Sequence, residues 1–119
     1  MNRKVITKEE LEQFLRKHKL WLENKEGGER ANLEGANLKW AKLEGANLDY
    51  SCLPLWCGSL SAHFDDKQLI QITYHLVRAG LNSNNASEEV KAELKKLIDL
   101  ANKFHRVNEC GVIKDGEKE

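Results

Sequence analysis

Apolar residues recur along this chain at two spacings, and each spacing predicts a different local structure. From residue 7 to residue 26 they fall three and four apart, which places them on one face of a helix. The residues on that face are Leu11, Phe14, Leu15, His18, Trp21 and Leu22. Thr7 and Glu10 have the spacing of a capping box, in which each side chain accepts from the other residue's backbone N–H. We therefore expect an N-terminal helix over 7–26, ended by Gly27 and Gly28.

The helical spacing returns in the second half of the chain, in two runs. One helix is expected to begin at Asp65 or Asp66 and to stop at Gly80, and the next to begin near Asn85 or Ser87. Their apolar positions are Leu69, Ile70, Ile72, Leu76 and Val77, then Val90, Leu94, Leu97, Ile98, Ala101 and Phe104. The pattern predicts a helical hairpin over 61–112, closed by Gly111. The charged tail over 113–119 is expected to be disordered.

Residues 31–50 repeat every five positions, a spacing that fits neither a helix nor a flat strand. They read ANLEG ANLKW AKLEG ANLDY, so Ala and Leu recur four times without a slip. The small Ala and the large Leu are expected to point inward. The polar residues between them are expected to point outward: Asn32, Glu34, Asn37, Lys39, Lys42, Glu44, Asn47 and Asp49. Such a chain must return to one orientation every five residues, as in a solenoid.

The repeat resembles the pentapeptide-repeat family, whose pattern is A-(N/D)-L-x-x. The resemblance implies a right-handed, four-sided β-helix with one pentapeptide per side. Residues 29–60 would form about one coil and its cap, with LPLWCGSL at 53–60 as the capping loop. The expected fold class is α+β: a short quadrilateral β-helix, flanked and capped by one N-terminal and two C-terminal α-helices. We expect a single domain over 1–119.

Charge and composition narrow the possible functions. Nineteen basic and nineteen acidic residues give a net charge of zero. Direct nucleic-acid binding, which needs clustered Lys and Arg, is therefore not expected. No apolar run approaches the length of a membrane span, and we do not expect the first residues, which contain no apolar run, to be a signal peptide. With three cysteines and no secretion signal, we expect a cytoplasmic protein with reduced thiols.

The sequence gives little support to catalysis or metal binding. Cys52, Cys57, His105 and Cys110 have C-x4-C and H-x4-C spacings, whereas strong zinc signatures contain C-x2-C pairs. Such cysteines are more often small core residues. Cys110 beside His105 could be a nucleophile, but no third orienting group is evident. We expect no enzyme activity, no cofactor and no metal.

A polar cluster near the C-terminus is the predicted ligand site. Arg106 can bind a carboxylate or phosphate with two parallel hydrogen bonds, and His105 lies beside it. The second helix could contribute Tyr74, His75 and Arg78 to the same space. The alternative is that these groups only cap a helix and pair with one another. A helix C-terminus is also electrically unfavourable for an anion.

Two aromatic residues suggest an interface. One coil has two open ends and a small core, so we expect a homodimer or a higher symmetric oligomer. Trp40 and Tyr50 lie at corners ten residues apart, on opposite sides of a four-sided coil. We expect a helix or a second subunit to bury at least one of them, because exposed aromatics anchor interfaces.

Two further segments are TKEELEQFLRKHKLWLENKEGGERANL at 7–33 and ANKFHRVNECG at 101–111. They resemble small pentapeptide-repeat proteins of phages and prophages of Gram-positive gut bacteria. The resemblance implies an accessory protein of the host cytoplasm that acts by binding. One hypothesis is a counter-defence protein that sequesters a small anionic nucleotide signal in a pocket between subunits. The alternative is a stoichiometric inhibitor of a host protein, such as a CRISPR nuclease or another nucleic-acid enzyme.

Overall fold

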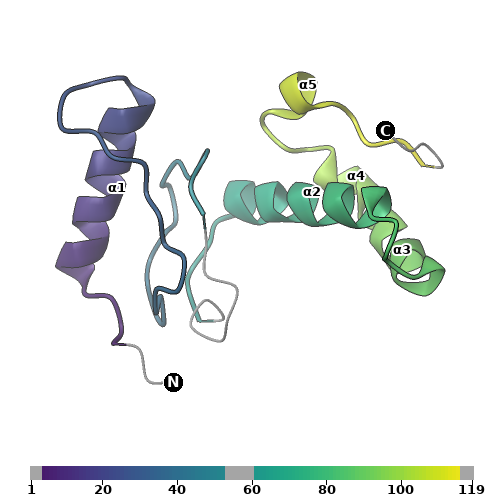
Figure 1. The fold of residues 1–119 in the computed structure, drawn as a ribbon, viewed down its shortest axis with the longest axis horizontal. Coiled ribbons are helices and arrows are strands. Elements are labelled where there is room, and N and C mark those ends of the chain that lie inside the picture. Colours follow the sequence, from purple (N-terminus) through teal and green to yellow (C-terminus); the bar gives the residue numbers. More distant parts are fainter. Residues whose placement is uncertain (1–3, 53–60, 116–119) are drawn as a thin grey trace. The chain divides into compact units, whose positions relative to one another are not determined.

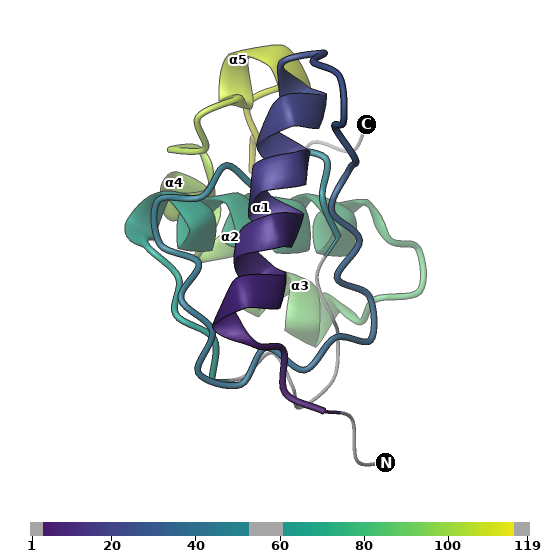
Figure 2. The same cartoon turned by 90° about the vertical axis from the view of Figure 1, so that its left-hand side faces the viewer.

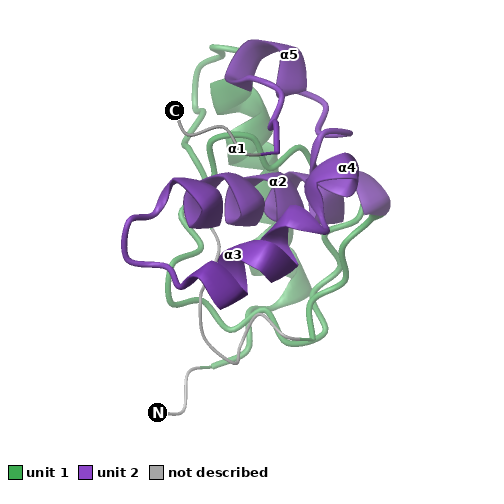
Figure 3. Ribbon diagram, turned by 90° about the vertical axis from the view of Figure 1, so that its right-hand side faces the viewer, with its two compact units in different colours: residues 1–65 green, residues 66–119 purple. Residues whose placement is uncertain are grey.

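The computed structural model describes residues 4–52 and 61–115 (Figure 1). The chain divides into two compact units, residues 1–65 and residues 66–119 (Figure 3). Each unit has a hydrophobic cluster of its own. Unit 1 holds α1 (Lys8–Leu22), and unit 2 holds α2 (Asp66–Asn82), α3 (Glu88–Lys95), α4 (Ile98–Ala101) and α5 (Val107–Cys110). The expectation of a single domain stays a prediction.

The predicted start of the first helix is confirmed. Glu10 N–H donates to Thr7 Oγ1 over 3.0 Å, and Thr7 N–H donates to Glu10 Oε1 over 3.1 Å. The helix ends at Leu22, four residues before the predicted bound. Asn24 takes a left-handed φ of 55°, and the N–H of Lys25 closes on Leu20 O at 2.9 Å. The turn therefore forms before the two glycines are reached.

The pentapeptides of unit 1 are a succession of tight turns. The carbonyls of Leu33, Leu38, Leu43 and Leu48 each accept from the N–H three residues further on, at 2.8–3.0 Å. The third turn residue has a positive φ in every case: Gly35 73°, Trp40 65°, Gly45 81° and Tyr50 66°. A positive φ at this position is the mark of a type II turn.

The recurring asparagines have a local task in these turns. The Oδ1 atoms of Asn32, Asn37 and Asn47 each accept from the backbone N–H two residues further on, at 2.9–3.1 Å. A short side-chain carbonyl is needed for this bond, which explains the Asn of the repeat. Lys42 stands at the equivalent place in the third pentapeptide and has no acceptor to offer.

The predicted quadrilateral β-helix is wrong for the part of the chain that the structure describes, where no β-strand forms. Parallel pairing is limited to isolated bridges, Val5 with Asn37, Asn32 with Cys52 and Lys42 with His63. The physical reason is that a tight turn follows every three residues. Adjacent segments of the same chain therefore pair at single residues only. Backbone pairing therefore never extends along a side. The predicted capping loop over 53–60 lies outside the described residues.

The inward phase of the repeat is confirmed. Leu33, Leu38 and Leu43 are fully buried and form one cluster with Leu11 of α1 and Ala41. Figure 2 looks onto α1, with the turns of the repeat behind it. The outward phase fails at Asp49, which is only 8% exposed.

Buried His18 links α1 to both ends of the repeat. Ala31 N–H donates to His18 Nδ1 over 3.0 Å, so Nε2 carries the proton and donates to the Asp49 carbonyl over 2.8 Å. The side chain is 1% exposed and stacks on Trp21 at 5.9 Å between ring centroids. The predicted place of His18 on the apolar face of the first helix is confirmed. The same bond holds the Asp49 backbone against the helix.

Unit 2 is helical, as predicted, but its helices have different bounds. Asp66 starts α2, and Ser87 caps α3 by accepting from Val90 N–H over 3.1 Å. Gly80 does not end α2, which runs to Asn82. A Cβ at Gly80 would lie 2.2 Å from Leu94 Cδ1, so this glycine permits close packing on α3.

The third predicted helix does not run unbroken to Phe104. The last turn of α3 tightens as Leu97 N–H donates to Leu94 O, and α4 begins at Ile98. The prediction of a disordered tail from residue 113 is wrong at its first position. Ile113 is buried, and its N–H and C=O both bond to the Asn102 side chain, at 2.8 and 2.9 Å.

Candidate binding surfaces

All five predicted ligand residues lie in unit 2, and two of them bind the chain's own backbone. Tyr74 donates its hydroxyl hydrogen to the Gly111 carbonyl over 2.6 Å. Arg78 donates to the Tyr74 hydroxyl over 2.7 Å and to the carbonyls of Cys110 and Gly111 over 3.1 and 2.6 Å. These contacts fasten the segment after α5 to α2. Both side chains therefore have structural partners in place.

The other three predicted residues surround Phe104 or follow it. His75 and His105 are exposed, and each meets the Phe104 ring edge-on, at centroid distances of 5.6 and 4.9 Å. Arg106 forms an ion pair with Glu109, three residues on. Its guanidinium therefore already has a carboxylate beside it. The structure brings these groups into one region, as the sequence predicted, together with a counter-charge.

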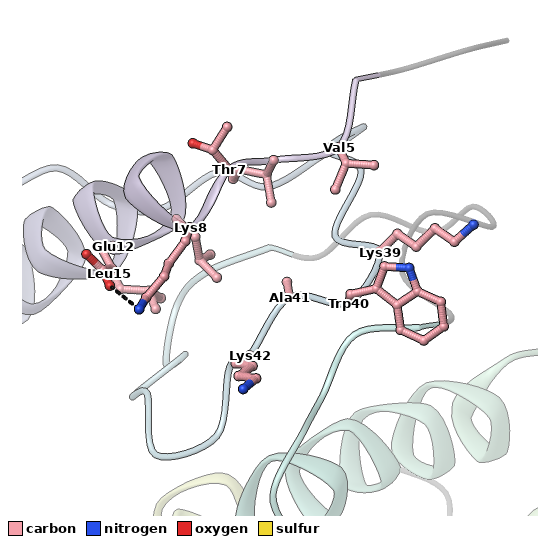
Figure 4. A pocket seen from close by; sticks show the side chains of 11 residues that line it. Val5, Thr7, Lys8, Glu12, Leu15, Lys39, Trp40, Ala41 and Lys42 are labelled. Atoms are coloured by element: carbon pink, nitrogen blue, oxygen red, sulfur yellow. Dashed lines mark ion pairs between the residues drawn. The ribbon is translucent and has the colours of Figure 1, made fainter.

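Unit 1 contains a groove of about 560 Å³ between the N-terminal segment, α1 and the repeat. Its apolar lining comes from Val5, Ile6, Leu11, Leu15, Trp40 and Ala41. Thr7, Lys8, Glu12, Lys39 and Lys42 supply the polar groups. Figure 4 shows Lys8 and Glu12 on the α1 side, and Lys39, Trp40 and Lys42 on the repeat side.

The charge at this groove is positive. Lys8 is paired with Glu12 of the same helix at 4.0 Å, and both side chains are largely exposed. Lys39 Nζ lies 5.8 Å from the Trp40 ring centroid, a distance suited to a cation–π contact. Neither Lys39 nor Lys42 forms an ion pair with any described residue. Two uncompensated lysines therefore stand on the repeat side of an apolar floor.

The two corner aromatics differ in their surroundings. Trp40 is 66% exposed and Tyr50 59% exposed. Tyr50 meets Trp21 of α1 edge-on at 5.9 Å, and Trp21 in turn lies under Arg30 at 6.0 Å. Trp40 instead is among the residues that line the groove. The expectation that a helix or a second subunit buries one of them is not met in the single chain, and burial by a second copy stays a prediction.

A comparison of neighbouring pentapeptides reveals a signal that the sequence reasoning missed. Residues 34–38 and 44–48 are both EGANL, whereas residues 39–43 between them read KWAKL. Lysine replaces glutamate, tryptophan replaces glycine, and lysine replaces asparagine. All three departures, Lys39, Trp40 and Lys42, line the groove. The apolar residues, Ala41 and Leu43, keep the repeat.

The cysteines do not form a metal site among the described residues, where no group of three potential ligands comes together. Cys52 lies in unit 1, with its Sγ 2.8 Å from Asn32 Oδ1, and Cys110 lies in unit 2. Both are exposed and free. Cys57 lies outside the described residues.

Comparison with known proteins identifies the repeat. Residues 29–53, about a fifth of the chain, match the family described as pentapeptide repeats (8 copies). This segment is a pentapeptide repeat. No curated protein and no solved structure matches the chain. Among the helices in the described part, none is long and apolar enough to cross a membrane.

Proposed function

We propose that this pentapeptide-repeat protein is a non-enzymatic binding protein that inhibits a host protein by stoichiometric contact through the groove of unit 1. The observation that carries the proposal is the KWAKL pentapeptide between two EGANL copies. Its core residues follow the repeat, and its three outward residues depart from the repeat and share one groove. A repeat that only had to fold would not need these departures.

The backbone at Trp40 supports the proposal. A tryptophan with a φ of 65° carries the strain of a left-handed conformation, which costs an L-residue about 1–2 kcal/mol. Glycine adopts this conformation freely and occupies it at Gly35 and Gly45. Strained residues that persist often mark functional sites. A large, exposed, rigid aromatic is the kind of side chain that dominates binding energy in protein interfaces.

The resemblance of the chain ends to phage and prophage proteins of Gram-positive gut bacteria suggests the setting. In that setting the protein acts in the cytoplasm of the host cell, and its target is an effector of host defence, such as a CRISPR nuclease or another nucleic-acid enzyme. Inhibition by contact needs no catalytic group, cofactor or metal in this protein.

The test is affinity capture from a lysate of a Gram-positive gut bacterium, with wild type and the Trp40→Gly variant compared side by side. We expect a host protein that is retained by wild type and lost with Trp40→Gly. The activity of that host protein should fall to zero once wild-type protein has been added to it at a fixed molar ratio. Tyr50→Gly, at the same turn position beside Trp21, is the matched control and should retain the target. Equal capture by wild type and Trp40→Gly would contradict the proposal.

The sequestration of an anionic nucleotide in an inter-subunit pocket is the second candidate. Its support is the row of rings in unit 2, where exposed His75 and His105 flank Phe104 and Arg106 follows. Bases stack on such rings, and Arg binds phosphate. The Arg106–Glu109 ion pair weighs against it, because a phosphate would have to displace the carboxylate.

Calorimetric titration with a panel of cyclic di- and oligonucleotides tests this second candidate. Binding that is lost in Arg106→Ala, with an unchanged melting temperature, would support it. Binding should strengthen in Glu109→Gln, which removes the carboxylate charge beside the guanidinium. No heat of binding for any panel member, with native mass spectrometry showing a single ligand-free copy, would remove the candidate.

A further inference from the structure

We infer that the groove of unit 1 binds an acidic, linear segment of its protein partner, whose carboxylates meet Lys39 and Lys42 and whose apolar side chain lies against Ala41. The inference rests on the proposed function and adds the chemistry of the partner. It depends on the charges around the groove and on the positions at which the KWAKL pentapeptide differs from the flanking EGANL copies.

The charged residues that line the groove determine the sign of the charge expected on the partner. The chain as a whole is neutral, yet the groove carries three lysines and one glutamate. Glu12 is already beside Lys8, which leaves Lys39 and Lys42 without an ion-pair partner among the described residues. The Glu-to-Lys replacement at position 39 also reverses a charge that the flanking copies keep. Complementary charge across an interface selects the partner and speeds association.

The lining determines the partner's shape and polarity. Lys39 and Lys42 lie on either side of Ala41 in sequence, and the apolar residues Leu11 and Leu15 face the same groove from α1. An occupant therefore needs an apolar group between acidic groups. Trp40 is two-thirds exposed. A site for a small molecule would enclose most of the ligand's surface. A projecting tryptophan instead suits insertion into a partner's surface, so we favour a segment of a protein.

The experiment selects binders from a random library of displayed linear peptides, with the full-length protein immobilised at low ionic strength. We expect enriched peptides with net negative charge and at least one large apolar residue between acidic residues. The affinity of one synthesised peptide should fall about tenfold or more in Lys39→Glu/Lys42→Asn, which restores the flanking repeat. It should fall in Trp40→Gly as well, and weaken as salt is raised.

The matched control is Lys67→Asn/Lys103→Glu, which makes the same change of charge at two exposed lysines of unit 2. It should bind the peptide as wild type does. The inference is overturned if the enriched peptides are neutral or basic, if both double variants bind alike, or if no peptide is enriched above the bare support. A host protein whose capture still depends on Trp40 would then leave the proposed function standing. Loss of that dependence as well would remove both.

Discussion

Unit 1 and unit 2 bury their apolar side chains by different means. The difference decides how easily residues kept for binding can be told apart from residues that the fold needs. In unit 1 three of the four turns contribute a leucine to one cluster, and Leu48 of the fourth turn is also buried, while the polar residues between the leucines mostly face outward. A departure such as Trp40 or Lys42 therefore stands out against its neighbours. In unit 2 the helices use polar side chains for packing and anchoring, as Arg78 and Tyr74 do. There a polar residue gives no such signal.

The strongest test of this contrast is the leucine position in the repeat. Leu43→Ala should reduce the free energy of unfolding by about 3–5 kcal/mol, because it leaves a cavity at a fully buried site. Glu44→Ala, one residue on and exposed, should change it by less than about 0.5 kcal/mol. Urea denaturation measures both. Equal losses would mean that the repeat does not separate core from surface.

His18 tests how the repeat is joined to α1. His18→Phe keeps a ring of similar size but removes the hydrogen bonds of the imidazole with the Ala31 N–H and the Asp49 carbonyl. We expect a loss of about 2–3 kcal/mol, because buried polar groups that lose their hydrogen bonds are costly. The same denaturation experiment applies. Wild-type stability in His18→Phe would show that the buried imidazole serves packing alone.

Arg78 tests the claim that polar residues of unit 2 serve the fold. Arg78→Ala removes the donors that hold the Cys110 and Gly111 carbonyls, and should cost about 1–2 kcal/mol. Arg78→Lys should recover little of this, because one ammonium cannot reproduce the planar fork. Hydrogen exchange at Ile113 should quicken in both variants. If Arg78→Ala is as stable as wild type, the residue is available for a ligand.

The smallest expected effect is at the exposed cap of α1. The hydrogen bond from the Thr7 backbone N–H, followed by the bond with the Thr7 hydroxyl and the charge of Lys4, lowers the pKa of Glu10. A lowered pKa in the folded state adds stability above the ordinary glutamate pKa of about 4.3, and this is lost as pH falls through the lower, folded value. Glu10→Gln should therefore flatten the acid side of the stability curve slightly. An unchanged curve would mean that the cap contributes nothing measurable.

Much of the fold could be predicted from local signals. The Thr7–Glu10 and Ser87 caps mark helix starts, and the five-residue period correctly indicated which leucines are buried. The predicted β-helix was wrong for the described residues, because the five-residue period does not determine how far adjacent segments of the chain run side by side, and ladder pairing depends on that length. Helix ends such as that of α2 depended on tertiary packing, since Gly80 accommodates Leu94 rather than ending the helix.

The candidate surfaces were predicted less well, for a physical reason. The polar residue types pointed to Arg106 near the end of the chain and to Arg78 of the second helix. The alternative, that such groups pair with one another, holds for Arg106, which pairs with Glu109. The bond of Arg78 to the Gly111 carbonyl becomes evident only in three dimensions. The groove joins residues 5–15 to residues 39–42, and no spacing rule connects these segments. Trp40 was identified as an interface residue from its corner position. For Lys39 and Lys42 the repeat pattern predicts only that they point outward.

On the proposed function, Trp40 is kept at a strained corner for binding rather than for folding. The most direct measurement is the free energy of unfolding of Trp40→Gly, with Gly45→Trp as the reverse change at the same turn position. Trp40→Gly should be more stable than wild type by about 0.5–1 kcal/mol, because the left-handed strain is relieved. Gly45→Trp, where a Cβ meets nothing within 4 Å, should be less stable by a similar amount. A loss of more than about 1 kcal/mol in Trp40→Gly would show that the fold itself needs the tryptophan.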